Sequence, residues 1–127
     1  MTAPAWLGAV IRDFGRAAGA DGFALNERGA AALTFETGAS LRLEYTGTEL
    51  VMAITLPWLG SADSLKRILA FSHPRARYGF RIRTGIIAKS NRLIAAVRLA
   101  ERDVTLPQVN SAFAVLWRIA GEIGGGA

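Results

Sequence analysis

The residues most able to do chemistry are the cations of the stretch SHPRARYGFRIRTGIIAKSNR, residues 72–92, which contains no acidic side chain. Guanidinium groups pair with phosphates and carboxylates in bidentate geometry, so such a stretch could bind either. Residues 64–100 carry a net charge of +9, whereas residues 1–63 carry −3 and residues 101–127 carry −1. This distribution predicts either a site for an acidic partner or a solvated strand face. The cations assigned to this patch are Arg75, Arg77, Arg81 and Arg83.

Side chains suited to catalysis or metal binding are sparse. The chain has no cysteine and one histidine, His73, which precedes a proline near the end of an expected helix. Its place there is better explained by contact with the last helix carbonyls than by a role as a general base. The sequence contains neither a G-x-S-x-G motif nor a cluster of carboxylates. We therefore expect no catalytic residue, metal or cofactor, and predict a protein that is not an enzyme.

Hydrophobic periodicity predicts the elements that position these side chains. Apolar residues at three- and four-residue steps predict a helix over 4–18, and further helices capped by Ser61 or Asp63 and by Thr105. Residues 23–56 alternate between apolar and polar side chains across short glycine turns, which is typical of antiparallel strands beginning at Phe23 and Leu25. The last strand of this series is apolar on both sides, which predicts cover on both faces. Two more strands are expected, at 78–87 and 93–99.

The resulting order is α-β-β-β-β-α-β-β-α, an antiparallel sheet with helices packed on it, in the α+β class. We expect a single domain over residues 1–123 and a flexible tail at 124–127. No apolar run approaches the ~20 residues that span a bilayer, and the N-terminal segment lacks the basic start of a signal peptide. The absence of cysteine fits a reducing compartment. These features predict a soluble cytoplasmic protein.

Three segments together resemble the class I type III secretion chaperones, small cytoplasmic proteins that escort effectors to a secretion apparatus. VIRDFGRAAGADGFALNERGAAALTFETG resembles the opening helix and first strands of that family, and ELVMAITLPWLG resembles a strand that ends near a glycine before the second helix. NRLIAAVRLAERDVTLPQVNSAFAVLWRIA resembles the last strand and the closing helix. The resemblance covers almost the whole chain. Two features depart from it: members are commonly acidic, and SHPRAR replaces the asparagine that often follows the second helix.

The resemblance implies a homodimer that binds an extended N-terminal segment of an effector and keeps it secretion-competent, with a role in virulence. Apolar side chains at this spacing usually form a core, and that alternative stays open for each predicted contact. Leu116 and Trp117 of the closing helix are interpreted as core. The predicted cargo-binding residues are Trp6, Phe14, Phe23, Phe35, Leu43 and Tyr45. The predicted dimer interface contains Leu65, Ile68, Leu69, Tyr78, Phe80 and Ile82.

The basic stretch leaves two functions to compare. In a dimer, two basic faces would lie close together and an acidic partner would relieve their repulsion, so we hypothesise that the cargo's binding segment is acidic. A pI of about 10.7 with aromatic residues beside arginines is also typical of nucleic-acid-binding proteins. No helix-turn-helix or RNP-like strand supports that role. The sequence favours the chaperone, and the alternative is a small basic nucleic-acid-binding or regulatory domain of similar fold.

Overall fold

The computed structural model of the 127-residue chain describes residues 2–72 and 79–124. Over these ranges the chain forms the helices α1 (Ala5–Ala17), α2 (Ala62–Ala70) and α3 (Leu106–Gly124). The strands are β1 (Ala30–Thr34), β2 (Ser40–Tyr45), β3 (Glu49–Pro57), β4 (Ile82–Ile87) and β5 (Arg92–Ala100). The short 3-10 helices η1 (Ala88–Ser90) and η2 (Glu101–Asp103) follow β4 and β5.

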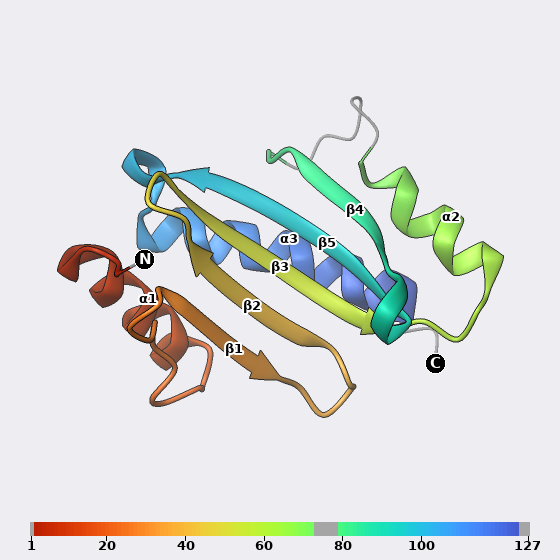
Figure 1. Ribbon diagram of the computed structural model, residues 1–127, viewed down its shortest axis with the longest axis horizontal. Coiled ribbons are helices and arrows are strands. Elements are labelled where there is room, and N and C mark those ends of the chain that lie inside the picture. The colour runs from red at the N-terminus through yellow and green to blue at the C-terminus, as the bar shows by residue number, and fades with distance from the viewer. Residues whose placement is uncertain (1, 73–78, 125–127) are drawn as a thin grey trace.

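The strands form one antiparallel sheet in the order β1-β2-β3-β5-β4 (Figure 1). The first three strands are a meander, whereas α2 separates β3 from β4, and β5 returns between them. This places β3 and β5 at the centre and leaves β1 and β4 as the two edges. The α+β class and the antiparallel sheet with packed helices are confirmed.

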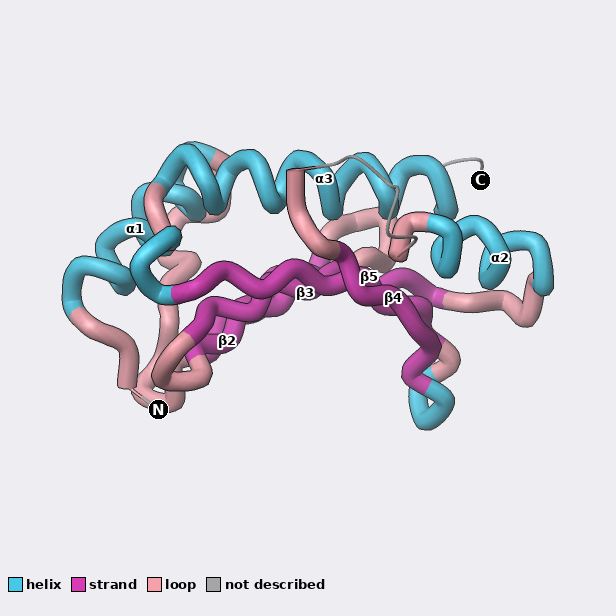
Figure 2. The backbone as a smooth tube through the Cα atoms, turned by 90° about the horizontal axis from the view of Figure 1, so that it is seen from above, coloured by secondary structure: helices cyan, strands magenta, loops and turns pink. Residues whose placement is uncertain are grey.

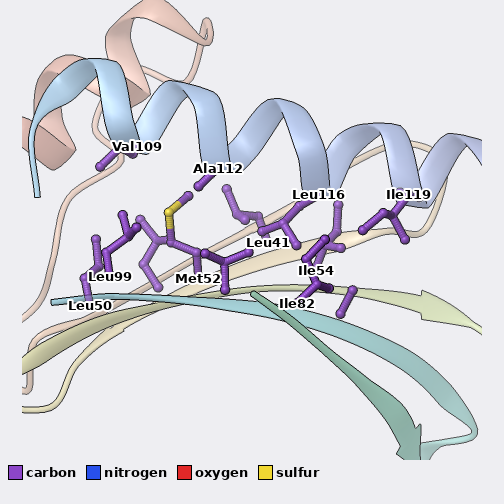
Figure 3. Packing of buried hydrophobic residues seen from close by; sticks show 14 of the residues in the cluster. Leu41, Leu50, Met52, Ile54, Ile82, Leu99, Val109, Ala112, Leu116 and Ile119 are labelled. Atoms are coloured by element: carbon purple, nitrogen blue, oxygen red, sulfur yellow. The ribbon is translucent and has the colours of Figure 1, made fainter. Parts of the chain in front are cut away.

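All three helices lie on the same side of the sheet (Figure 2). The core forms where the 3.6-residue repeat of α3 meets the two-residue repeat of the strands, so both elements bury one apolar face. The α3 side chains are directed toward strand residues such as Leu41, Met52 and Ile54 (Figure 3). The contributing α3 residues are Val109, Ala112, Leu116 and Ile119.

The expected strand at Phe23 and Leu25 is not formed, so the described part of the sheet has one strand fewer than predicted. The Phe23 amide donates to the Ala20 carbonyl in a turn, at 3.1 Å, and the Phe23 ring packs into the core against Phe14. Gly15 makes this possible, because a Cβ at that position would lie 2.7 Å from the Phe23 Cβ. A loop rather than a strand therefore buries Phe23 and partly buries Leu25.

Predicted helix starts agree with the structure. Ser61 caps α2, since its hydroxyl accepts a bond from the Ser64 amide at 3.2 Å, and Thr105 does the same for the Gln108 amide at 3.3 Å. No helix in the described ranges is long and apolar enough to cross a membrane. The predicted tail begins at Gly124, which ends α3. Residues 125–127 lie outside the described residues, as do His73, Arg75, Arg77 and Tyr78.

Candidate functional site

An aromatic cluster runs from the core to the surface between α1, α3 and the end of β1. Phe14 packs edge-on against Phe113, with ring centroids 5.3 Å apart. Phe113 packs against Phe35 at 6.3 Å and Trp117 at 5.8 Å, and the Phe35 and Trp117 rings meet at 4.7 Å. Phe14 is buried, whereas Trp117 is 42% exposed. We call the solvent end of this cluster, formed by Phe35, Phe113 and Trp117, the aromatic surface.

The edge of β1 leads directly to the aromatic surface, because Phe35 follows its last residue. The Phe35 amide donates to the Ala39 carbonyl at 2.8 Å, in register with the β1–β2 ladder. Residues of an antiparallel pair alternate between bonding the partner strand and pointing away from it. By this alternation, Ala32 and Thr34 direct their backbone N–H and C=O groups away from β2. The β1 edge therefore offers unpaired backbone groups beside exposed aromatic rings.

The opposite edge of the sheet lies beside a second apolar surface. Leu69 of α2 is 45% exposed, and Ile86 of β4 is also exposed. Leu59, in the loop before α2, is 95% exposed, and Leu65 is partly buried. We call these four residues the α2–β4 surface. Next to it, a shallow hollow between α2 and the end of α3 is lined by Arg67, Ala70, Phe71, Glu122 and Ile123.

The cations near this edge are solvent-exposed. Arg81 precedes β4 and Arg83 lies on it, and neither forms an ion pair with any residue of the described ranges. Arg67 of α2 pairs with Asp63 one turn earlier, at 3.3 Å between Nε and Oδ2. Both of these side chains are more than half exposed, so the pair adds at most about 1 kcal/mol to stability. Arg81 and Arg83, with no ion pair in the described ranges, are thus available for contacts with a partner.

The type III secretory system chaperone SycN family matches residues 6–124 of the chain. This protein belongs to that chaperone family. No curated protein sequence matches it.

Solved structures agree with this chaperone in fold. The ExsC–ExsE complex is similar, with a TM-score of 0.76 and 15% identity, over 94% of this chain and 92% of the other. The Yersinia pestis type III secretion chaperone SycH, solved with a stable fragment of YscM2, gives 0.69 and 22% over 92% and 98%. The HopA1–SchA chaperone–effector complex gives 0.66 and 16% over 89% of each chain. The predicted family is confirmed, and the nucleic-acid alternative is not favoured.

The predicted cargo contacts of the chaperone divide into two groups. Trp6 on α1 is 47% exposed, and Phe35 belongs to the aromatic surface. The side chains of the other four contact the protein's own core, so a bound segment could reach them only if the core opened. These four are Phe14, Phe23, Leu43 and Tyr45.

The sequence interpretation missed the exposure of Trp117, which it assigned to the core with Leu116. Adjacent helix residues point about 100° apart, and Leu116 is fully buried beneath α3. Phe113 and Trp117 are four residues apart and share one side of the helix, so this spacing was the available signal.

The predicted dimer contacts of the chaperone also differ in exposure. Ile68 and Ile82 are buried in the core of the single chain, whereas Leu69 is exposed. Leu65 and Phe80 are partly buried against the core. Within the predicted set, Leu69 therefore offers the largest free apolar surface among the described residues.

Proposed function

We propose that this chaperone binds an extended N-terminal segment of a secreted effector along the β1 edge and over the aromatic surface. The observation that carries the proposal is the exposed Trp117 ring beside a strand edge with unpaired backbone groups. The proposal is supported by the HopA1–SchA chaperone–effector complex, because a chain of that structure has the same fold as this chaperone. Such a protein acts in the cytoplasm, where the effector is held before secretion. Its task is to keep the bound segment unfolded, which requires binding and no catalysis.

The energetics of this mode suit an unfolded ligand. An added strand gains backbone hydrogen bonds from the sheet edge, and pockets for alternate side chains supply selectivity. Burial of apolar area stabilises a complex by roughly 25 cal/mol per Å². A segment that covers ~1,000 Å² would thereby gain enough to offset the cost of ordering it.

We also propose that the chaperone is a homodimer that pairs through the α2–β4 surface, as dimerisation is typical of the family. Exposed leucines on a monomer are unremarkable singly, but Leu59, Leu69 and Ile86 lie on neighbouring elements at one edge. Pairing there would leave the β1 edge of each copy at the far side of the sheet, open to the effector.

The first experiment is co-purification of the tagged chaperone with the N-terminal regions of proteins encoded beside its gene. Substitution of Trp117→Ser should lower retention at least about tenfold, because the exposed ring is the main apolar anchor. Trp117→Phe keeps an aromatic ring and should retain binding. Equal retention by Trp117→Ser and the wild type would contradict the proposed surface.

Two further measurements complete this test. Trp6→Ser asks whether the effector segment extends along α1, and should lower retention less than Trp117→Ser. A gel-shift assay with mixed nucleic acid at ~150 mM salt should show no complex, since weak phosphate binding is lost at that ionic strength.

A further inference from the structure

One face of the sheet is covered by none of the described helices (Figure 2). Strand residues whose neighbours enter the core point to this bare face. Its centre is made of small or aliphatic side chains, and Ala53 is only 8% exposed although no helix lies over it. A floor of small side chains lets another peptide approach the sheet closely. Its members are Ala32, Val51, Ala53, Ile94 and Ala96.

Two arginines flank Ala53 and Ala96 of this floor in a single row across the sheet. Arg83 of β4 pairs with Ala96 of β5, which pairs with Ala53 of β3. Ala53 then pairs with Arg42 of β2, which pairs with Ala32 of β1. Three strand spacings of roughly 4.8 Å separate the two arginines, so their Cα atoms lie about 14 Å apart.

The charge of the bare face is positive. Its described strand positions carry four arginines and two glutamates, which are Arg42, Arg83, Arg92, Arg98, Glu44 and Glu49. Two of the arginines are used by the protein itself. Arg98 bonds Glu49 at 3.1 Å, and Arg92 donates to the Thr55 hydroxyl at 3.0 Å and the Gly38 carbonyl at 2.7 Å.

The other two arginines, Arg42 and Arg83, are exposed and have no hydrogen bond or ion pair to a side chain of the described ranges. Among the described strand positions of this face, the one remaining carboxylate is Glu44, on the same strand as Arg42. An incoming carboxylate would therefore meet two guanidinium groups that no described partner neutralises.

We propose that the bare face binds an extended acidic segment of the chaperone's protein partner, with carboxylates four residues apart on Arg42 and Arg83. The spacing follows from geometry, since four residues of extended chain at ~3.4 Å each span about 14 Å. Guanidinium groups bind carboxylates in bidentate fashion, and the small side chains between them leave room for the connecting backbone. This inference rests on the proposed function and names the chemistry of the recognised segment.

The bare face and the aromatic surface lie on opposite sides of the sheet and meet at the β1 edge, where Ala32 ends the row. One partner could thus follow the β1 edge with an apolar segment on Phe35 and Trp117 and then turn onto the bare face, where an acidic segment crosses the strands from Arg42 to Arg83. The basic middle third of the sequence then contributes Arg83 to the same ligand.

The test uses isotope-labelled full-length chaperone and peptides of about twelve residues in a serine–threonine background. One peptide carries two glutamates four residues apart, a second carries two adjacent glutamates, and a third has lysines in place of the spaced glutamates. NMR titration to ~1 mM peptide should move the amide signals of Ala53 and Ala96 most with the first peptide. The lysine peptide should leave them unmoved.

Charge reversal supplies the matched comparison. Arg42→Glu with Arg83→Glu should weaken binding of the first peptide about tenfold and create binding of the lysine peptide, since both charge pairs are reversed. Arg12→Glu with Arg102→Glu changes the net charge equally away from the bare face and should change neither. Unfolding of each variant by urea shows that the fold is kept.

The inference is overturned if the spaced-glutamate peptide moves no signals of the bare face, or if the R42E/R83E protein binds it as well as the wild type. Equal binding of the two glutamate peptides would remove the spacing. If effector regions still co-purify with the wild type and not with Trp117→Ser, the proposed function stands even when the peptide test fails. If no effector region depends on Trp117 but the spaced-glutamate peptide still binds the bare face, only the proposed function is removed.

Discussion

The two edges of the sheet expose different chemistry. β1 carries no charged side chain, has free backbone groups at Ala32 and Thr34, and lies beside the aromatic surface. β4 carries Arg83, follows Arg81, and lies beside the exposed Leu69 of α2. Charged residues on an edge strand oppose pairing with another chain. The β1 edge is therefore suited to strand addition, whereas the β4 edge is suited to contacts between side chains.

The difference teaches that one core can support two kinds of interface. Both edge strands belong to one sheet whose central strands are β3 and β5, and α3 packs on this sheet (Figure 3). What separates the edges is their local sequence, because β1 belongs to the weakly acidic first half and β4 to the basic middle third. The experiments below separate the edges in order of decreasing effect.

The largest effect should come from the shared support. Leu116 is fully buried between α3 and the sheet, so Leu116→Ala removes a packed side chain and should cost about 2–5 kcal/mol of unfolding free energy. Both edges should then lose their partners together. Urea unfolding followed by circular dichroism measures the loss. Trp117→Ala, one residue further and 42% exposed, should cost less, and equal costs would mean that α3 does not dock as described.

The next effect should be confined to the β4 edge. Leu69→Glu places a carboxylate in the proposed pairing surface, and burying an unpaired charge is costly, so the dimer should dissociate to monomers. Size-exclusion chromatography with light scattering reports the mass. Trp6→Glu has nearly the same exposure on α1 and should remain a dimer. Should both variants keep the dimer mass, the α2–β4 surface is not where two copies meet.

A smaller effect should be confined to the β1 edge. Ala32→Pro removes an N–H that points away from β2, so the sheet should keep its stability, while an added strand loses one hydrogen bond. Such a bond contributes about 1 kcal/mol, which corresponds to roughly fivefold in affinity. Fluorescence anisotropy with the co-purified effector region measures the change.

The neighbouring position provides the control for this edge. The Ala31 amide points to β2 by the same alternation, so Ala31→Pro should lower the stability of the sheet itself. If Ala32→Pro destabilised the protein as much as Ala31→Pro, the assignment of the free edge would be wrong.

Much of the fold could be predicted because burial follows simple periods. Apolar steps of three and four residues marked α1 and α3, and alternation marked β2, in which Leu41, Leu43 and Tyr45 are buried. The sequence wrongly predicted a strand at Phe23, where the structure has a loop. Alternation over two apolar residues does not say whether a partner strand exists. Pairing is a property of the folded sheet and not of the segment.

The centre of β3 is buried on both faces, although the described helices lie over only one of them. Ala53 and Thr55 are buried without a helix above them, since small side chains at the centre of a sheet are shielded by neighbouring strands. The Arg92 side chain also donates a hydrogen bond to the Thr55 hydroxyl. Of the predicted cargo-binding side chains, only Trp6 and Phe35 reach the surface. Exposure of aromatics depends on how α3 docks, and that is decided by long-range packing.

The smallest expected effect concerns a bond between the two halves of the sheet. Tyr45 is the last residue of β2, which pairs with β1. Its hydroxyl donates to Oε1 of Glu101 at 2.5 Å, and Glu101 directly follows β5. This hydrogen bond, with burial and the charge of Glu101, raises the pKa of Tyr45 above its ordinary value of 10.0. The phenol must be protonated to donate. Its contribution is therefore complete below pH 10 and is lost as the pH rises from there through the raised pKa.

Tyr45→Phe isolates this contribution, because the ring is kept and the hydroxyl is removed. The wild type should be more stable than the variant near pH 8, and the difference should shrink as the pH approaches 11. Urea unfolding of the two proteins at each pH measures the difference. A difference that stays constant across this range would show that the phenol does not link β2 to η2 in solution. The two edges would then be joined only by the hydrogen bonds of the sheet and by the apolar core.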